Sequence, residues 1–175
     1  IAFASQNVIV SITGTNDIPV VSIGSLDTAA ASLTETNAIL SASGTLTVVD
    51  SDLSDSVYAS VDSVQTSGSF SGTNPLSNTA LKAMLSVTSA PINANTGDTR
   101  NLTWSFNSGN NNAFDFLATG QTLVLTYSIK AEDSDSAIAF ASQNVIVSIT
   151  GTNDTPLISG KINGEVKEAG GGNNS

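Results

Sequence analysis

The sequence repeats itself at long range. Residues 1–17, which read IAFASQNVIVSITGTND, return letter for letter as residues 138–154. An identity of this length in a chain of 175 residues is not a chance event, so the sequence covers part of a tandem array. We expect residues 1–17 to be the last strand and linker of one repeat, and residues 18–154 to be one complete repeat. Residues 155–175 are then a linker and the start of another repeat, partly disordered.

Most of the chain alternates apolar and polar residues with a period of two, which is typical of strands with one buried face. Clusters of Gly, Asn and Ser separate these segments. About seven or more short strands with turn signals predict an all-β fold, an antiparallel β-sandwich of the immunoglobulin or cadherin type. The expected strands cover residues 8–13, 19–33, 40–49, 57–64, 102–106, 122–130 and 138–150.

One segment breaks the alternation and predicts a short helix near residues 75–86. Asn74 is the expected N-cap and Pro75 the first helical residue. Leu76, Ala80 and Met84 would then share one face of the helix.

Composition excludes several classes of function. The chain has no cysteine and no histidine, so disulfides, thiolate sites, imidazole zinc sites and histidine acid–base chemistry are ruled out. With 15 acidic and 5 basic residues the net charge is −10, which would repel nucleic acid and anionic membrane surfaces. No stretch reaches the roughly 18 apolar residues of a membrane span. Surplus carboxylates attract cations instead, and oxygen ligands suit hard cations such as Ca²⁺.

The sandwich topology predicts where these carboxylates gather. We call the end at which the chain enters the domain the upper end. Strands 40–49 and 122–130 both run towards it, so Asp50, Asp52, Asp133 and Asp135 should converge there, beside Asn16 and Asp17. Carboxylates this close repel one another unless a cation joins them.

The lower end is expected to hold a second group. Glu35 should lie at the lower turn, beside Asn153 and Asp154 of the next junction. The two groups together give the expected calcium ligands: Asn16, Asp17, Glu35, Asp50, Asp52, Asp133, Asp135, Asn153 and Asp154. Asp27, Asp62, Asp98 and Asp115 have no convergent partner in this interpretation, and we expect solvated or turn roles for them.

Three segments carry a resemblance to a known family. ASGTLTVVDSD, FLATGQTLVLTYSIKAEDSDS and VIVSITGTND followed by proline resemble the VCBS repeats of large bacterial RTX-type adhesins, a cadherin-like group. The resemblance implies a calcium-rigidified extender repeat of a secreted adhesin, at the bacterial cell surface, acting in adhesion or biofilm formation. Its partners would be neighbouring repeats and calcium ions.

The resemblance also implies which residues bind metal. A Glu near the first turn, Asp-x-Asp after the second strand, Ala-x-Asp before the last strand and an Asn-Asp linker correspond here to Glu35, Asp50 with Asp52, Asp133, and Asn16-Asp17 or Asn153-Asp154. Two departures stand out. Gly14 and Gly151 occupy the place of a further linker Asp, and the mid-domain Asp-x-Glu pair has no counterpart.

Two other classes of function are alternatives. A carbohydrate-binding adhesive module would use the irregular insertion at 65–113, with an exposed Trp104 as a stacking surface. A glycosidase needs two carboxyls across a cleft, which the strand pattern does not suggest, so we expect no enzyme. We expect most of these aromatic residues to be core: Trp104, Phe106, Phe114, Phe116 and Tyr127. Residues 1–13 should be frayed, or pair with a sheet edge of another molecule.

Overall fold

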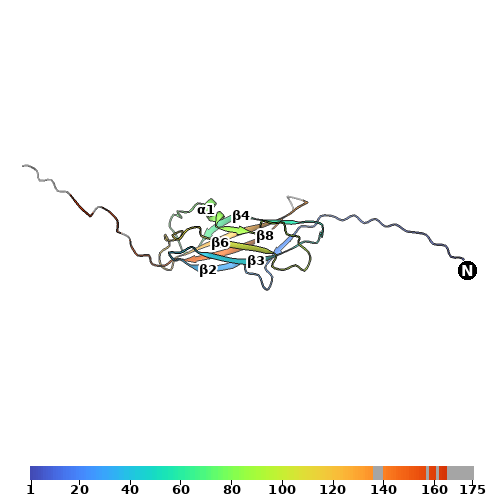
Figure 1. Cartoon of the computed structure of the whole chain (residues 1–175), viewed down its shortest axis with the longest axis horizontal. Helices are drawn as coiled ribbons and strands as arrows, with labels where there is room; N and C mark the ends of the chain where they lie inside the picture. The colour runs from blue at the N-terminus through green and yellow to red at the C-terminus, as the bar shows by residue number, and fades with distance from the viewer. Residues whose placement is uncertain (136–139, 157, 161, 165–175) are drawn as a thin grey trace, which may run out of the picture.

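Two four-stranded sheets form a sandwich in the computed structural model, which describes residues 1–135, 140–156, 158–160 and 162–164 (Figure 1). One sheet has the order β1-β3-β6-β5 and the other β2-β8-β7-β4. The predicted all-β sandwich is confirmed. Its elements are β1 (Val20–Ser22), β2 (Ala30–Thr34), β3 (Ser41–Val49), β4 (Val57–Ser67), α1 (Asn78–Ala83), β5 (Leu85–Val87), β6 (Leu102–Asn107), β7 (Thr122–Asp133) and β8 (Phe140–Thr150).

The core lies between the sheets and follows the period-two pattern. Every second residue of β7 is buried, and Leu125, Tyr127 and Ile129 have no exposed surface. On β8, Val145 and Val147 are likewise fully buried. Each buried side chain of this size contributes roughly 1.5–3 kcal/mol relative to leaving it exposed. The expected core aromatics are confirmed, four of them at most 1% exposed and Phe116 partly buried: Trp104, Phe106, Phe114, Phe116 and Tyr127.

The strand predicted over residues 19–33 is instead two strands in different sheets. β1 pairs with β3 antiparallel, whereas β2 pairs with β8 in parallel. The chain crosses between the sheets over Gly44, where a Cβ would lie 2.3 Å from the Thr28 carbonyl oxygen. That carbonyl accepts the indole N–H of the buried Trp104 over 2.6 Å. The expectation of a wholly antiparallel sandwich is therefore wrong at the β2–β8 pair, because the chain changes sheet without reversing direction.

The predicted helix exists, but it begins later. Ser77, not Asn74, is the N-cap, and its hydroxyl accepts the Ala80 N–H over 3.2 Å. Asn74 Oδ1 instead accepts the Leu76 N–H two residues on (2.9 Å), which makes a local turn. The buried face is also different, because Leu81 is fully buried and Ala80 is exposed.

The two copies of the repeated segment have opposite environments. Residues 1–18 form no helix or strand, and every one of them is exposed. The segment extends from the upper end of the sandwich, which lies at the right in Figure 1. Val8 and Val10 are 85% and 77% exposed, whereas their copies Val145 and Val147 are buried. Neighbouring residues 138 and 139, and most of the tail at 161–175 predicted to be disordered, lie outside the described residues. No helix within the described residues is long and apolar enough to cross a membrane.

Candidate metal sites at the two ends of the sandwich

Glu35 is the centre of the lower end, where β2 and β8 finish. Its backbone N–H donates to the Thr150 carbonyl over 2.7 Å, and the residue is only 1% exposed. Thr152 donates its hydroxyl and its N–H to Glu35 Oε2 over 2.7 and 3.3 Å. The other carboxylate oxygen, Oε1, is buried and has no hydrogen-bond partner among the described residues. A buried unpaired carboxylate oxygen carries a desolvation penalty that a ligand could relieve.

Asp115 and Asp154 complete a cluster with Glu35. One oxygen from each of the three carboxylates lies within 4.8 Å of the others. Calcium–oxygen bonds of 2.3–2.6 Å allow two ligands of one ion to lie up to about 5 Å apart. Desolvation, together with the charges of Glu35 and Asp115, raises the pKa of the Asp154 carboxyl. The trio therefore has the donor atoms and the spacing of a site for a hard cation.

Asp115 is the residue that sequence reasoning missed, because it was assigned a solvated or turn role. It lies between β6 and β7, and the buried Phe114 and Leu117, each 1% exposed, hold its loop on the lower end. Its Oδ2 accepts the Asn112 side-chain amide, while Oδ1 is buried without a partner in the described structure. The available signal was an acidic residue placed between two aromatic core residues, in the sequence FDF.

The upper end gathers the Asp-x-Asp pairs through backbone hydrogen bonds. Asp50 Oδ1 accepts the Asp52 N–H over 3.0 Å, and Asp133 Oδ1 accepts the Asp135 N–H over 2.9 Å. Asp50 and Asp133 are 2% and 4% exposed. Asp50 Oδ2 is a further buried oxygen without a partner in the part of the chain that the structure describes.

The linker is bound to the same end. The Asn16 side-chain amide donates to Asp133 Oδ2 over 2.7 Å, and the Asp17 N–H donates to Asp52 Oδ2 over 2.6 Å. These two bonds join the linker to carboxylates from two different strands, because Asp52 follows β3 and Asp133 is the last residue of β7. The predicted upper residues are thus brought together by hydrogen bonds.

Asp55 is a second residue that the sequence did not assign to the upper group. A hydrogen bond from the Ser54 hydroxyl lowers its pKa, but desolvation and the charges of Asp135, Asp133 and Asp52 outweigh that bond, so the pKa is raised. Carboxylates therefore repel one another at the upper end as well as at the lower end.

No basic side chain in the described part of the chain neutralises either group. Among the described residues the one ion pair joins Lys130 Nζ to Glu132 Oε1 over 2.6 Å, on the outer face of the second sheet. Of the predicted lower residues, Glu35 and Asp154 meet. Asn153 lines the same depression as Asp154 and Asp115, and within the described structure its amide donates to the Asp154 carbonyl alone, over 3.4 Å.

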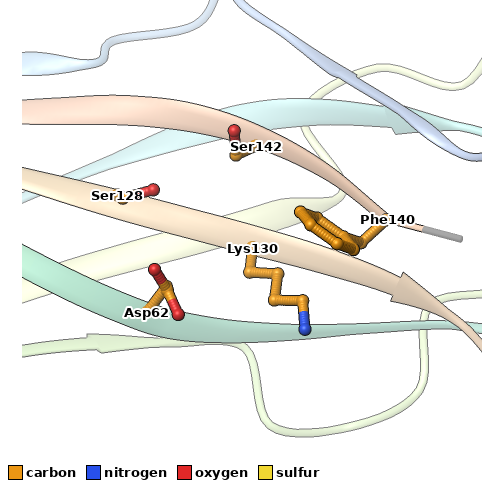
Figure 2. A pocket seen from close by; sticks show the side chains of 5 residues that line it. All are labelled: Asp62, Ser128, Lys130, Phe140 and Ser142. Carbon is orange, nitrogen blue, oxygen red and sulfur yellow. The ribbon is translucent and has the colours of Figure 1, made fainter. Parts of the chain in front are cut away.

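Trp104 does not provide the predicted sugar-stacking surface. Trp104 has no exposed surface, so its ring is unavailable for stacking. A shallow depression lies instead on the outer face of the second sheet (Figure 2). There the Lys130 ammonium lies 4.5 Å from the Phe140 ring centroid and already pairs with Glu132. The depression is lined by Asp62, Ser128, Lys130, Phe140 and Ser142.

No protein-family model matches the chain, and no curated protein matches it. Weak structural similarities exist to three solved domains. An ASH/PapD-like domain of human CEP192 (PapD-like domain 7) is 7% identical with a TM-score of 0.42, covering 88% of this chain and 99% of that chain. The CooA pilin subunit of enterotoxigenic Escherichia coli is 13% identical with a TM-score of 0.40 (79% and 100% covered). AggA, the major subunit of aggregative adherence fimbriae type I of Escherichia coli, is 12% identical with a TM-score of 0.34 (81% and 98%). At these scores the similarities identify neither a family nor a function.

Proposed function

We propose that this chain is an extender repeat of a secreted bacterial cell-surface adhesin of the VCBS, RTX-adhesin type, made rigid by Ca²⁺ at its junctions. In this proposal the repeat performs no catalysis and spaces a distal binding domain from the cell in adhesion or biofilm formation. The 11 residues of β8 span about 36 Å at roughly 3.3 Å per residue, so each repeat would add a length of that order.

The lower cluster carries the proposal. Glu35, Asp115 and Asp154 place three carboxylate oxygens within 4.8 Å of one another. Two of these residues, Glu35 and Asp115, also have a buried oxygen with no partner in the described structure. An unneutralised cluster of this kind is destabilising, whereas an oxygen-ligand cation removes the repulsion and supplies the missing partner.

The position of the cluster explains how a cation could stiffen an array. Asp154 belongs to the linker, while Glu35 follows β2 and Asp115 lies between β6 and β7. A cation held by all three would fix the start of the linker to the domain that precedes it. At the other end, Asp52 and Asp133 bind the linker that enters the domain. The negative upper face would thus be the second half of each junction.

Thermal unfolding with calcium and with chelator tests the proposal. Extracellular calcium modules have dissociation constants of about 10⁻⁴ to 10⁻³ M. Calcium at 100 times the dissociation constant should add about 2.7 kcal/mol per independent site. Asp115→Asn should remove most of this calcium-dependent stabilisation, because the cluster loses one anionic ligand.

Asp62→Asn is the matched control, since it makes the same change of charge on the exposed outer face of β4, away from both ends (Figure 2). It should keep the full effect of calcium. A melting temperature that calcium does not change would reject the proposal, and so would equal losses in the two variants.

A further inference from the structure

The structure contains the same linker twice, bound at opposite ends of one domain. Residues 14–17 and 151–154 both read Gly-Thr-Asn-Asp. The two copies share one local hydrogen bond: the side-chain amide of Asn16 and that of Asn153 each donate to the carbonyl of the next residue, over 3.2 and 3.4 Å. Their contacts with the domain are nevertheless different.

At the lower end, the hydrogen bonds among the described residues hold the first half of the linker to the domain. Gly151 is buried, donates its N–H to the Gln121 carbonyl over 2.8 Å and accepts the Gly120 N–H over 3.0 Å. Thr152 donates to Glu35 with both its hydroxyl and its N–H. Pro156, which follows the linker, is exposed.

At the upper end, the opposite half is held. Asn16 and Asp17 donate to Asp133 and Asp52, over 2.7 and 2.6 Å. Pro19, the copy of Pro156, is buried against the domain. Gly14 is exposed, and nothing lies within 4 Å of the position that a Cβ would take on it.

We infer that each Gly-Thr-Asn-Asp linker is a two-sided clip: Gly-Thr binds the domain before it, and Asn-Asp binds the domain after it. The interaction surface is therefore the end of a second copy of this domain. Consecutive domains would be joined with no free residue in the linker, and the hydrogen bonds alone would set their spacing.

The two sets of bonds are compatible on a single linker. The lower set uses the Gly backbone and the Thr hydroxyl and N–H, whereas the upper set uses the Asn amide and the Asp N–H. No donor is needed twice for contacts between domains. The Asp carboxylate also stays available for the lower cluster, as Asp154 shows. The inference rests on the repeat and on these bonds, and does not require calcium.

The chain provides its own matched controls, because identical residues should behave differently. Backbone ¹⁵N order parameters, measured in chelator, should be about 0.85 at Gly151, Thr152, Asn16 and Asp17, and below about 0.6 at Gly14 and Thr15. Thr152→Val should lower the order parameters there and reduce the melting temperature by several degrees, whereas Thr15→Val should change neither.

The reciprocal pair tests the other half of the linker. Asn16→Ala should bring the order parameter of Asp17 below about 0.6, whereas Asn153→Ala should leave Thr152 rigid. Equal effects of the two Thr variants, or Asn16 and Asp17 as mobile as residues 1–13, would overturn the clip.

A chain with one more copy of residues 18–154 inserted after Asp154 tests the complete junction. All four residues of the internal linker should then be rigid. If they are rigid in chelator, the clip holds and calcium is not needed for it. If they are rigid only with calcium, the calcium proposal holds and the clip, which needs no metal, is wrong. If they are flexible in both conditions, the clip is wrong, whatever calcium does to the melting temperature.

Discussion

Replacing Gly151 by alanine should destabilise the domain, although the same change at its sequence copy should not. A Cβ on Gly151 would lie 2.5 Å from the Leu117 carbonyl oxygen and 2.6 Å from that of Ala118. Both atoms are backbone, and real Cβ contacts this short do not occur, so the chain must move by about half an ångström or more. Two hydrogen bonds, to Gln121 and from Gly120, oppose that movement.

The magnitude follows from these contacts. Overpacking of this kind typically lowers the free energy of unfolding by about 1–3 kcal/mol. Replacing glycine by alanine also raises it by about 0.4–1 kcal/mol, because alanine restricts the unfolded chain. A net loss near 1.3 kcal/mol corresponds to a melting temperature about 4–6 °C lower for a domain of this size. Gly14→Ala meets nothing within 4 Å and should change the melting temperature by less than about 1 °C.

Differential scanning calorimetry of the two variants and the parent chain, in chelator, measures both values. Urea unfolding gives the free energies independently, with the m-value as a check that both variants expose the same surface. Similar shifts for Gly151→Ala and Gly14→Ala would refute the reasoning, because the two sites have the same local sequence and differ only in what packs against them.

Four further substitutions test the fold. Asp27 accepts hydrogen bonds from Thr47, Thr45 and the Gly24 N–H, over 2.6, 2.8 and 2.8 Å. Desolvation raises its pKa, but these bonds outweigh desolvation and the pKa is lowered. The stabilisation by Asp27 should therefore be present above about pH 4 and be lost as the pH falls through the lowered pKa. In urea unfolding, Asp27→Asn should lower the free energy of unfolding by about 1–3 kcal/mol at pH 7. The difference between the parent chain and the variant should be smaller at pH 3. Ser77→Ala should lower the free energy of unfolding by about 1 kcal/mol through the loss of the helix cap, and Asn74→Ala should lower it by less. Chemical unfolding of both variants compares the two losses. A larger loss for Asn74→Ala would show that Asn74 is the cap. Trp104→Phe removes the hydrogen bond to the Thr28 carbonyl and part of the core. Urea unfolding should therefore show a free energy of unfolding lower by about 2–4 kcal/mol. A variant as stable as the parent chain would show that the crossing between the sheets does not depend on this indole.

Local patterns were sufficient where the structure depends on neighbouring residues. The alternation in β7 and β8 predicted which side chains are buried, since the period of a strand fixes the face of every residue once one face is buried. The helix was found from its break in that pattern, but its cap was misplaced. Asn74 and Ser77 are both good caps by composition, and only the three-dimensional path of the chain decides which of them accepts the Ala80 N–H.

The carboxylate groups were predictable only in part, for a related reason. Asp50 and Asp133 lie at strand ends, so strand direction alone placed them at one end of the domain. Asp115 lies in a loop whose path follows no period, and the burial of Phe114 and Leu117 decides where it lies. Gly151 has no room for the side chain of the further linker Asp that the resemblance would place there.

The sequence by itself determined that the chain is repetitive, rich in β-structure and acidic at its predicted junctions, because these properties are carried by residue identity and spacing. Tertiary structure alone decided the split of the first predicted strand into β1 and β2, the addition of Asp115 to the lower cluster, and the different contacts of the two linkers. The two linkers are identical in sequence, so no local rule could distinguish them. Their difference comes from the end of the domain against which each one packs.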